Sequence, residues 1–315
     1  MYNTTKKNFI ERIMLAIIIP YYKLTFFRET LDSLAAQSDK RFNVYIGNDG
    51  SPEDPEELLQ EFKSKFSFTY EKFADNLGGT SLTKQWERCI DMIQNEEWFM
   101  ILGDDDVLNS NNVSIFWQSV KRVTKSDHIL SFDYQKINGK GEIVSNIYKV
   151  PENFTGIELY CRKISGGFMT SLSQHIFKKK TYEKYGFLDL PLAWASDDFA
   201  VIEISEGQKI FCLNDVVYIR ISTENISGRK DLDEKKNHAL NFFYIKLFYK
   251  YGKSLNKIQK EKLFAAFFKK MIEFPTSFGV SFFRLLWQFG KEQMIFYTIS
   301  FFKIKIVRLF HKNNI

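Results

Sequence analysis

The sequence has few cysteines and no long apolar run. Its cysteines, Cys89, Cys161 and Cys212, are widely spaced and odd in number, which fits neither a disulfide framework nor a CxxC metal site. We therefore expect a reducing, cytosolic setting. The apolar run at residues 13–19 ends at Pro20 and is too short for a secretory signal. The sequence has no stretch of about 18 uninterrupted apolar residues, so we expect no membrane-spanning helix.

Apolar and aromatic residues are plentiful, and basic residues are unevenly placed. At 315 residues, with 44% apolar and 17% aromatic content, the chain can bury the core of one domain of about 200 to 250 residues plus an appendage. Residues 237–315 hold 14 Lys and Arg against 3 Asp and Glu, a net of +11, which leaves residues 1–236 at −5. A basic tail on an acidic body predicts contact with an anionic surface.

The first hundred residues alternate apolar runs with helical patterns. Strands are expected at Met14–Ile19, Phe42–Gly47, Phe68–Phe73 and Trp98–Leu102, and helices at Thr25–Gln37, Glu53–Phe66 and Leu82–Gln94. Strands that are apolar at consecutive positions are buried on both faces, as in a parallel sheet wound by helices. This α/β pattern predicts a nucleotide-binding unit at about residues 13–107.

The later sequence changes character twice. A helix is expected at Asn112–Thr124 and a hairpin at Asn138–Gly141, so residues 108–230 predict a mixed half rather than further βαβ units. Residues 231–315 have a helical pattern and are rich in aromatic and basic residues. We therefore expect a catalytic domain at residues 1–230 and a C-terminal helical region that associates with a membrane.

Polar residues follow the second and fourth expected strands, where an open α/β sheet binds its ligands. Asn48–Ser51 reads NDGS, which taken alone is an ordinary turn. The run Asp104–Asp106 is different, because three adjacent carboxylates repel each other unless a cation or solvent neutralises them. A solvated acidic turn is one interpretation, and a site for Mg²⁺ or Mn²⁺, which prefer oxygen ligands, is the one we favour.

These motifs, in this order, resemble glycosyltransferase family 2, whose members have the GT-A fold. The resemblance runs from about Leu15 to Ser227, through the Pro20–Tyr21 strand end, the NDGS turn, the Asn76–Gly78 element and the helix QWERC at Gln85–Cys89. Asn48 replaces the first Asp of the family's Asp-Asp-Gly-Ser signature. The resemblance implies donor-binding roles for Pro20, Tyr21, Asp49, Asn76, Gly78, Lys84, Asp104, Asp105 and Arg220.

The resemblance also implies a metal site and a catalytic base. Asp104–Asp106 matches the Asp-x-Asp metal motif, with Gly103 in the first place of its longer form, so the ligating carboxylate stays open between Asp106, which we favour, and Asp104. The family's acidic pair matches Asp197 and Asp198. An isolated pair of this kind could simply cap a helix. In the family order, Asp198 becomes the catalytic base.

One late motif departs from the family. Its Tyr-Arg-x-His element is represented by Tyr218 and Arg220, but Ser222 follows and the His is missing. Arg220 could therefore contact the donor diphosphate or pair with a carboxylate.

Together these residues predict an inverting transferase that uses Mn²⁺ or Mg²⁺ and a nucleotide-sugar donor, UDP-linked. The resemblance further implies an acceptor hydroxyl on a saccharide or a lipid-linked molecule, bound on the side of residues 108–230, and a place in bacterial surface polysaccharide synthesis. The basic aromatic segment 296–310 predicts a peripheral position at the inner face of the plasma membrane, on anionic lipid. Nucleic acid is not an expected partner, since no recognisable module accompanies the basic residues. A non-catalytic membrane scaffold and a nucleotidyltransferase are the alternatives, although the latter would need a glycine-rich phosphate loop.

Overall fold

The computed structural model describes residues 15–223 and 225–273. The strands are β1 (Leu15–Tyr21), β2 (Phe42–Asn48), β3 (Phe68–Lys72), β4 (Trp98–Ile101), β5 (Val107–Leu108), β6 (Ile129–Ile137), β7 (His175–Lys178) and β8 (Phe211–Arg220). The helices are α2 (Phe27–Ala35), α3 (Glu56–Gln60), α4 (Leu82–Ile90), α5 (Asn112–Val120), α6 (Gly156–Ile164), α7 (Lys179–Tyr185), α8 (Ser196–Ile204), α9 (Asp233–Tyr251) and α10 (Lys257–Glu273). Two short 3₁₀ helices, η1 (Leu172–Gln174) and η2 (Pro191–Ala193), lie between them.

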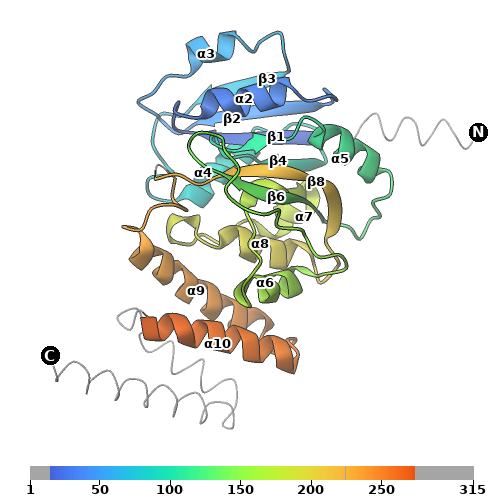
Figure 1. The fold of residues 1–315 in the computed structure, drawn as a ribbon, viewed down its shortest axis with the longest axis vertical. Coiled ribbons are helices and arrows are strands. Elements are labelled where there is room, and N and C mark those ends of the chain that lie inside the picture. Colours follow the sequence, from blue (N-terminus) through green and yellow to red (C-terminus); the bar gives the residue numbers. More distant parts are fainter. Residues whose placement is uncertain (1–14, 224, 274–315) are drawn as a thin grey trace, which may run out of the picture. The chain divides into compact units, whose positions relative to one another are not determined.

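The strands form one mixed sheet in the order β3-β2-β1-β4-β7-β6-β8-β5 (Figure 1). Its first four strands are parallel, with Ile17 in register with Val44 of β2 and Met100 of β4. β7 then pairs antiparallel to both β4 and β6. The predicted nucleotide-binding half is therefore the parallel part, and the predicted mixed half supplies the remaining strands, which gives the GT-A fold.

Helices cover both faces of the parallel strands. On one face, alternate residues of β1 such as Ile17 join a buried cluster with Leu31 of α2 and Phe116 of α5. On the other face, Cys89 of α4 packs so closely on Gly47 that a Cβ there would lie 2.2 Å from the sulfur. Each large apolar side chain that is fully buried contributes roughly 1.5 to 3 kcal/mol. The apolar runs form strands because side chains on both faces of the sheet contribute this free energy of burial.

Most expected elements are found, with shifted ends. The hairpin at Asn138–Gly141 is confirmed, because the amide of Gly141 donates to the carbonyl of Asn138 at 3.0 Å. The helix expected at Glu53–Phe66 was too long, since α3 spans only Glu56–Gln60. Proline lacks an amide proton and disfavours helical backbone in the residue before it, so the helix begins after Pro55.

The chain divides into two compact units. One comprises residues up to 189 together with 196–229, and the other comprises 190–195 and the residues from 230. In the second unit, the ring of Phe248 in α9 stacks on that of Phe264 in α10, with centroids 4.5 Å apart. Part of the C-terminal aromatic set is therefore ordinary helix packing. The segment 296–310 lies outside the described residues, and no described helix is both long and apolar enough to cross a membrane.

Candidate active site

The acidic triplet lies beside the end of β1. Oδ2 of Asp104 accepts hydrogen bonds from the amides of Tyr22 at 2.8 Å and Lys23 at 3.0 Å. Tyr21 itself points into the core, where its side chain is fully buried and its hydroxyl donates to the carbonyl of Glu53 at 2.8 Å. The tyrosine side chain near the strand end is therefore that of Tyr22, and not the predicted Tyr21.

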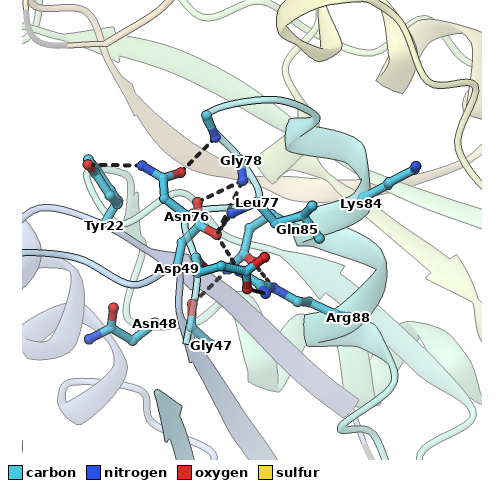
Figure 2. Close-up of polar contacts among 12 residues, drawn as sticks. Tyr22, Gly47, Asn48, Asp49, Asn76, Leu77, Gly78, Lys84, Gln85 and Arg88 are labelled. Atoms are coloured by element: carbon cyan, nitrogen blue, oxygen red, sulfur yellow. Dashed lines mark hydrogen bonds and ion pairs between the residues drawn. The ribbon is translucent and has the colours of Figure 1, made fainter. Parts of the chain in front are cut away.

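Asp49 organises the loop that follows β3. Figure 2 shows its carboxylate facing the amides of Leu77 and Gly78, which donate to it at 2.8 and 2.9 Å. The guanidinium of Arg88, from α4, pairs with the same carboxylate. Burial nevertheless raises the pKa of Asp49, although these donors oppose the increase. In this conformation Asp49 holds the loop, and its predicted contact with the donor stays a prediction.

The same loop is joined to the end of β1. Nδ2 of Asn76 donates to the hydroxyl of Tyr22 at 3.0 Å (Figure 2). Because the amide of Tyr22 also binds Asp104, the Asp49 loop and the acidic triplet share one hydrogen-bond network. Lys84 is exposed and directed away from Asp49, and Pro20 is half-buried within β1. The network therefore lies at the carboxyl ends of the parallel strands, the usual ligand position.

Asp106 is held on both of its carboxylate oxygens. Oδ2 accepts from the hydroxyl of Ser173 at 2.6 Å, and Oδ1 accepts from the amide of Arg220 at 2.9 Å. The guanidinium of Arg220 is fully buried, where it donates to the carbonyl of Asp105 and pairs with Glu29. Arg220 therefore supports the triplet in this structure, and its predicted contact with the donor stays a prediction.

Burial makes the triplet resist ionisation. Desolvation, reinforced by the charge of Asp105, raises the pKa of Asp104 to about 7 and that of Asp106 to about 8. Hydrogen bonds from Ser173 and the amide of Arg220 oppose the increase at Asp106. The pKa of Asp105 is also raised by burial. A bound cation would offset the cost of three ionised carboxylates, so the site fits a hard divalent ion.

The described residues supply only part of a metal site. Among them, no group of three or more His, Cys, Asp or Glu side chains is arranged to hold an ion. Asp105 has one side-chain partner, Nδ2 of Asn225 at 3.2 Å, whereas both oxygens of Asp106 are engaged. Mg²⁺ and Mn²⁺ commonly bind one or two carboxylates and complete their coordination with substrate phosphates. Asp104 is engaged on Oδ2 alone, so the geometry favours Asp104 and Asp105 over Asp106, and the predicted metal ligands Asp106 and Asp104 stay a prediction.

The acidic pair opens α8, and its two members differ. Asp198 is buried, with Oδ2 accepting from the ammonium of Lys163 at 2.6 Å and Oδ1 from the hydroxyl of Thr170 at 2.8 Å. Asp197 is only half-buried. Burial, followed by the charge of Asp198, raises the pKa of Asp197 to about 7, while Lys163 opposes the increase. The pair therefore contains one neutralised carboxylate and one that titrates near neutral pH.

A short segment connects the acidic pair to the triplet. Thr170 binds Asp198, and three residues later Ser173 binds Asp106. The hydroxyl of Ser173 also accepts from the amide of Gly103 at 3.1 Å. The two carboxylate groups predicted from the sequence are therefore held by one stretch of chain. Lys163, Thr170 and Ser173 were not predicted, since a lysine in a helix and hydroxyls in a loop carry no signal of their own.

The family comparison covers more than half of the chain. The family model described as Glycosyl transferase family 2 matches residues 16–186. Among curated proteins, the uncharacterized glycosyltransferase RP339 of Rickettsia prowazekii (strain Madrid E) is 27% identical over 129 residues, which are 40% of this chain and 38% of that protein. An uncharacterized glycosyltransferase of Rickettsia felis (strain ATCC VR-1525 / URRWXCal2) is 26% identical over 150 residues, 46% of this chain and 23% of that protein. The matches thus span less than half of each relative.

Solved structures share the fold at low sequence identity. S. aureus TarS 1-349 in complex with UDP-GlcNAc superposes with a TM-score of 0.63 at 16% identity, over 83% of this chain and 73% of that one. The mannosyltransferase PcManGT from Pyrobaculum calidifontis, in complex with GDP-Man and Mn²⁺, gives a TM-score of 0.55 at 14% identity, over 92% of this chain and 79% of that one.

Proposed function

The chain belongs to glycosyl transferase family 2, and from that premise we propose that it is a metal-dependent, inverting enzyme. It would transfer a sugar from a nucleoside diphosphate, UDP in our proposal, to a hydroxyl of a saccharide or lipid-linked acceptor. Bacterial surface polysaccharide synthesis is the setting that we propose for it. The observation that supports this proposal is a hydrogen-bond network. It joins Asp49, the acidic triplet and the acidic pair through Tyr22 and the Thr170–Ser173 segment.

Each part of this network has a role in the proposed reaction. Asp49 and the Asn76–Gly78 loop would bind the nucleoside, and the triplet would face the diphosphate. A divalent ion, when bound beside Asp105, would supply positive charge to the leaving diphosphate. The acidic pair of α8 would take the proton of the attacking hydroxyl. The chain offers no reason for a covalent intermediate, so a single displacement with inversion is the simplest mechanism.

A donor screen tests this proposal. The purified 315-residue chain would be incubated with UDP-glucose, UDP-GlcNAc or GDP-mannose, with Mn²⁺ or with EDTA, and the released nucleoside diphosphate measured. We expect release from one donor, with Mn²⁺ only. Full activity in EDTA would overturn the metal assignment. Donor binding without turnover would favour the non-catalytic scaffold, and neither binding nor turnover with any donor would overturn the transferase.

We also propose that the C-terminal region associates with anionic lipid at the inner face of the plasma membrane. The net +11 of residues 237–315 supports this, because each basic residue near such a surface contributes roughly 1 kcal/mol. A peripheral, cytoplasmic position would bring the enzyme to a membrane-embedded acceptor. The aromatic rings of α9 and α10 that pack on each other are not available for lipid, so the proposal rests on the residues beyond them.

A further inference from the structure

An exposed apolar cluster lies on the hairpin that follows β6, which we define as residues 138–149. Ile143, Val144 and Ile147 are 59%, 54% and 44% exposed. They are three of the seven large apolar side chains that are exposed in the described part of the chain, and they lie within five consecutive positions. Single exposed apolar residues are ordinary, whereas a cluster on one short segment indicates an interaction surface.

Hydrogen bonds fix the backbone of this hairpin against β6. The amide of Val144 donates to the carbonyl of Lys136 at 2.9 Å, and the amide of Tyr148 donates to the carbonyl of Tyr134 at 2.8 Å. The rings of the two tyrosines stack, with centroids 4.8 Å apart. The apolar cluster therefore belongs to a defined surface and not to a loop without regular contacts.

The hairpin contacts residues of the candidate active site at both of its ends. At its start, the buried guanidinium of Arg220, which supports the acidic triplet, donates to the carbonyl of Asn138 at 2.9 Å. At its end, Tyr148 stacks on the buried Tyr134. Burial first, and then the neighbouring Tyr148 and Asp198, raise the pKa of Tyr134, which places its ring near the acidic pair. The hairpin is therefore anchored beside both carboxylate groups of the site.

The hairpin is basic although the body that carries it is acidic. Residues 136–149 hold three lysines against one glutamate, a net of +2, whereas residues 1–236 have a net charge of −5. Lys140 and Lys149 are exposed, and neither forms an ion pair with a carboxylate of the described residues. An anionic surface therefore attracts the hairpin more than it attracts the acidic body as a whole.

We propose that this hairpin is a membrane contact of the catalytic domain, distinct from the basic C-terminal tail. Its aliphatic side chains enter the headgroup region of an anionic bilayer, and Lys140 and Lys149 pair with the lipid phosphates. Apolar side chains flanked by basic residues are the combination that binds such an interface. A soluble anion would use the lysines alone and leave the apolar cluster in water, so a bilayer is the occupant that uses both.

The contact does not depend on the transfer reaction, and it goes beyond the proposed function. It assigns a bilayer-facing surface to the unit that holds the site, whereas the membrane association proposed above concerns the tail alone. If the transfer reaction holds as well, the contact would bring the edge of the site to the surface where a lipid-linked acceptor lies.

A fluorescent label tests the contact directly in the full chain. Ile143→Cys, carrying an environment-sensitive label, should shift its emission to shorter wavelength when vesicles of equal parts phosphatidylglycerol and phosphatidylcholine are added, because the label leaves water. Ile143 pairs with Ile137 at the end of β6, whereas Ser126 is exposed and precedes its start, about 30 Å along the strand. The same label on Ser126→Cys should therefore not shift. Wild-type protein, labelled in the same way, measures the signal from the three native cysteines.

Apolar variants measure the contribution of the cluster. Ile143→Ser combined with Ile147→Ser should lower the partition coefficient on the same vesicles by about tenfold or more, because two large apolar side chains no longer enter the interface. The conservative pair Ile143→Leu with Ile147→Leu should bind like the wild type. All of these side chains are exposed, so the Tm of each variant should stay that of the wild type.

Charge variants measure the contribution of the lysines. Lys140→Gln combined with Lys149→Gln should lower binding by about tenfold at low salt and by less at high salt. Lys121→Gln combined with Lys125→Gln removes the same charge from exposed positions between α5 and β6 and should bind like the wild type. Equal loss in both pairs would show that only net charge matters and would overturn the assignment to the hairpin.

Three other results would overturn the proposal. One is an unchanged emission of the label at position 143 on vesicles, with binding carried by the tail alone. Another is a serine pair that sediments with vesicles like the wild type. The third is a label at position 143 that is shielded from water before vesicles are added, because another part of the chain or a second copy would then cover the hairpin; recovery on dilution would identify the second copy. None of these measurements uses a donor, so failure of the donor screen would count against the proposed function alone.

Discussion

The stability of the metal-free protein should depend on pH through the acidic triplet. The pKa of Asp106 is about 8 and that of Asp104 about 7 in the folded state, against about 3.9 for an aspartate in an unfolded chain. Between pH 4 and pH 8 the folded protein therefore binds more protons than the unfolded chain. By linkage, the free energy of unfolding falls as pH rises through this window, and the loss is complete above about pH 8.

The size of the effect follows from Asp106 alone. One extra proton on the folded state changes the free energy of unfolding by about 1.4 kcal/mol per pH unit. Between pH 6 and pH 8 Asp106 goes from protonated to about half ionised, so it contributes about 2 kcal/mol. For a domain of this size that corresponds to a change in Tm of roughly 5 °C. Asp106→Asn removes this titration, and its Tm should vary less with pH by that amount.

Thermal unfolding followed by circular dichroism at pH 6, 7 and 8, in EDTA, measures this difference. Asp32→Asn, which changes an exposed carboxylate on α2, is the control and should follow the wild type. Mn²⁺ with UDP should flatten the wild-type profile, because a bound cation favours the ionised carboxylates. Parallel profiles for wild type and Asp106→Asn would refute the assignment of a neutral, buried Asp106.

Three further predictions concern the loop, the buried arginine and the tail. Gly78→Ala places a Cβ 2.5 Å from the carboxylate of Asp49, so donor binding measured by calorimetry should weaken about tenfold or more while the fold persists. Arg220→Met leaves the carbonyls of Asp105 and Asn138 without their buried donor and should cost about 1 to 3 kcal/mol in urea unfolding, whereas Arg28→Met, in an exposed ion pair, should cost less than about 1 kcal/mol. In liposome co-sedimentation, binding should require anionic lipid, weaken in high salt and fall when residues 291–315 are deleted; indifference to lipid charge would reject the membrane role.

The parallel half of the fold could be predicted because its strands are buried on both faces. Such strands appear in the sequence as unbroken apolar runs, and β1, β2 and β4 were found within two residues of their ends. The helix after β2 was placed too long, because its apolar residues repeat at helical spacing although the backbone is helical only at Glu56–Gln60. Phe62 and Phe66 lie in the turns that follow α3, and both are buried. The apolar pattern therefore predicted the burial correctly but the backbone conformation incorrectly.

The site was predictable where chemistry follows a strand directly. The acidic triplet and Asp49 each follow an apolar strand. Acidic residues at that end of a strand commonly bind a ligand or a cation, so their position indicated a site. The roles within the site were not predictable, because they depend on contacts between distant residues. Lys163 and Asp198 are 35 positions apart, and Ser173 and Asp106 are 67 apart. Whether Tyr21 or Tyr22 reaches the site depends on the direction in which each side chain points from the end of β1. The side chain of Tyr21 points into the core.

The buried carboxylates of the site are unfavourable for the fold when they are ionised. Asp104, Asp106 and Asp197 all resist ionisation in the bare protein, because burial penalises their charged forms. The Thr170–Ser173 segment donates to a carboxylate in each group, so any movement of that segment changes the environment of both. The acidic pair and the triplet are therefore connected through Thr170 and Ser173, which lie only three residues apart.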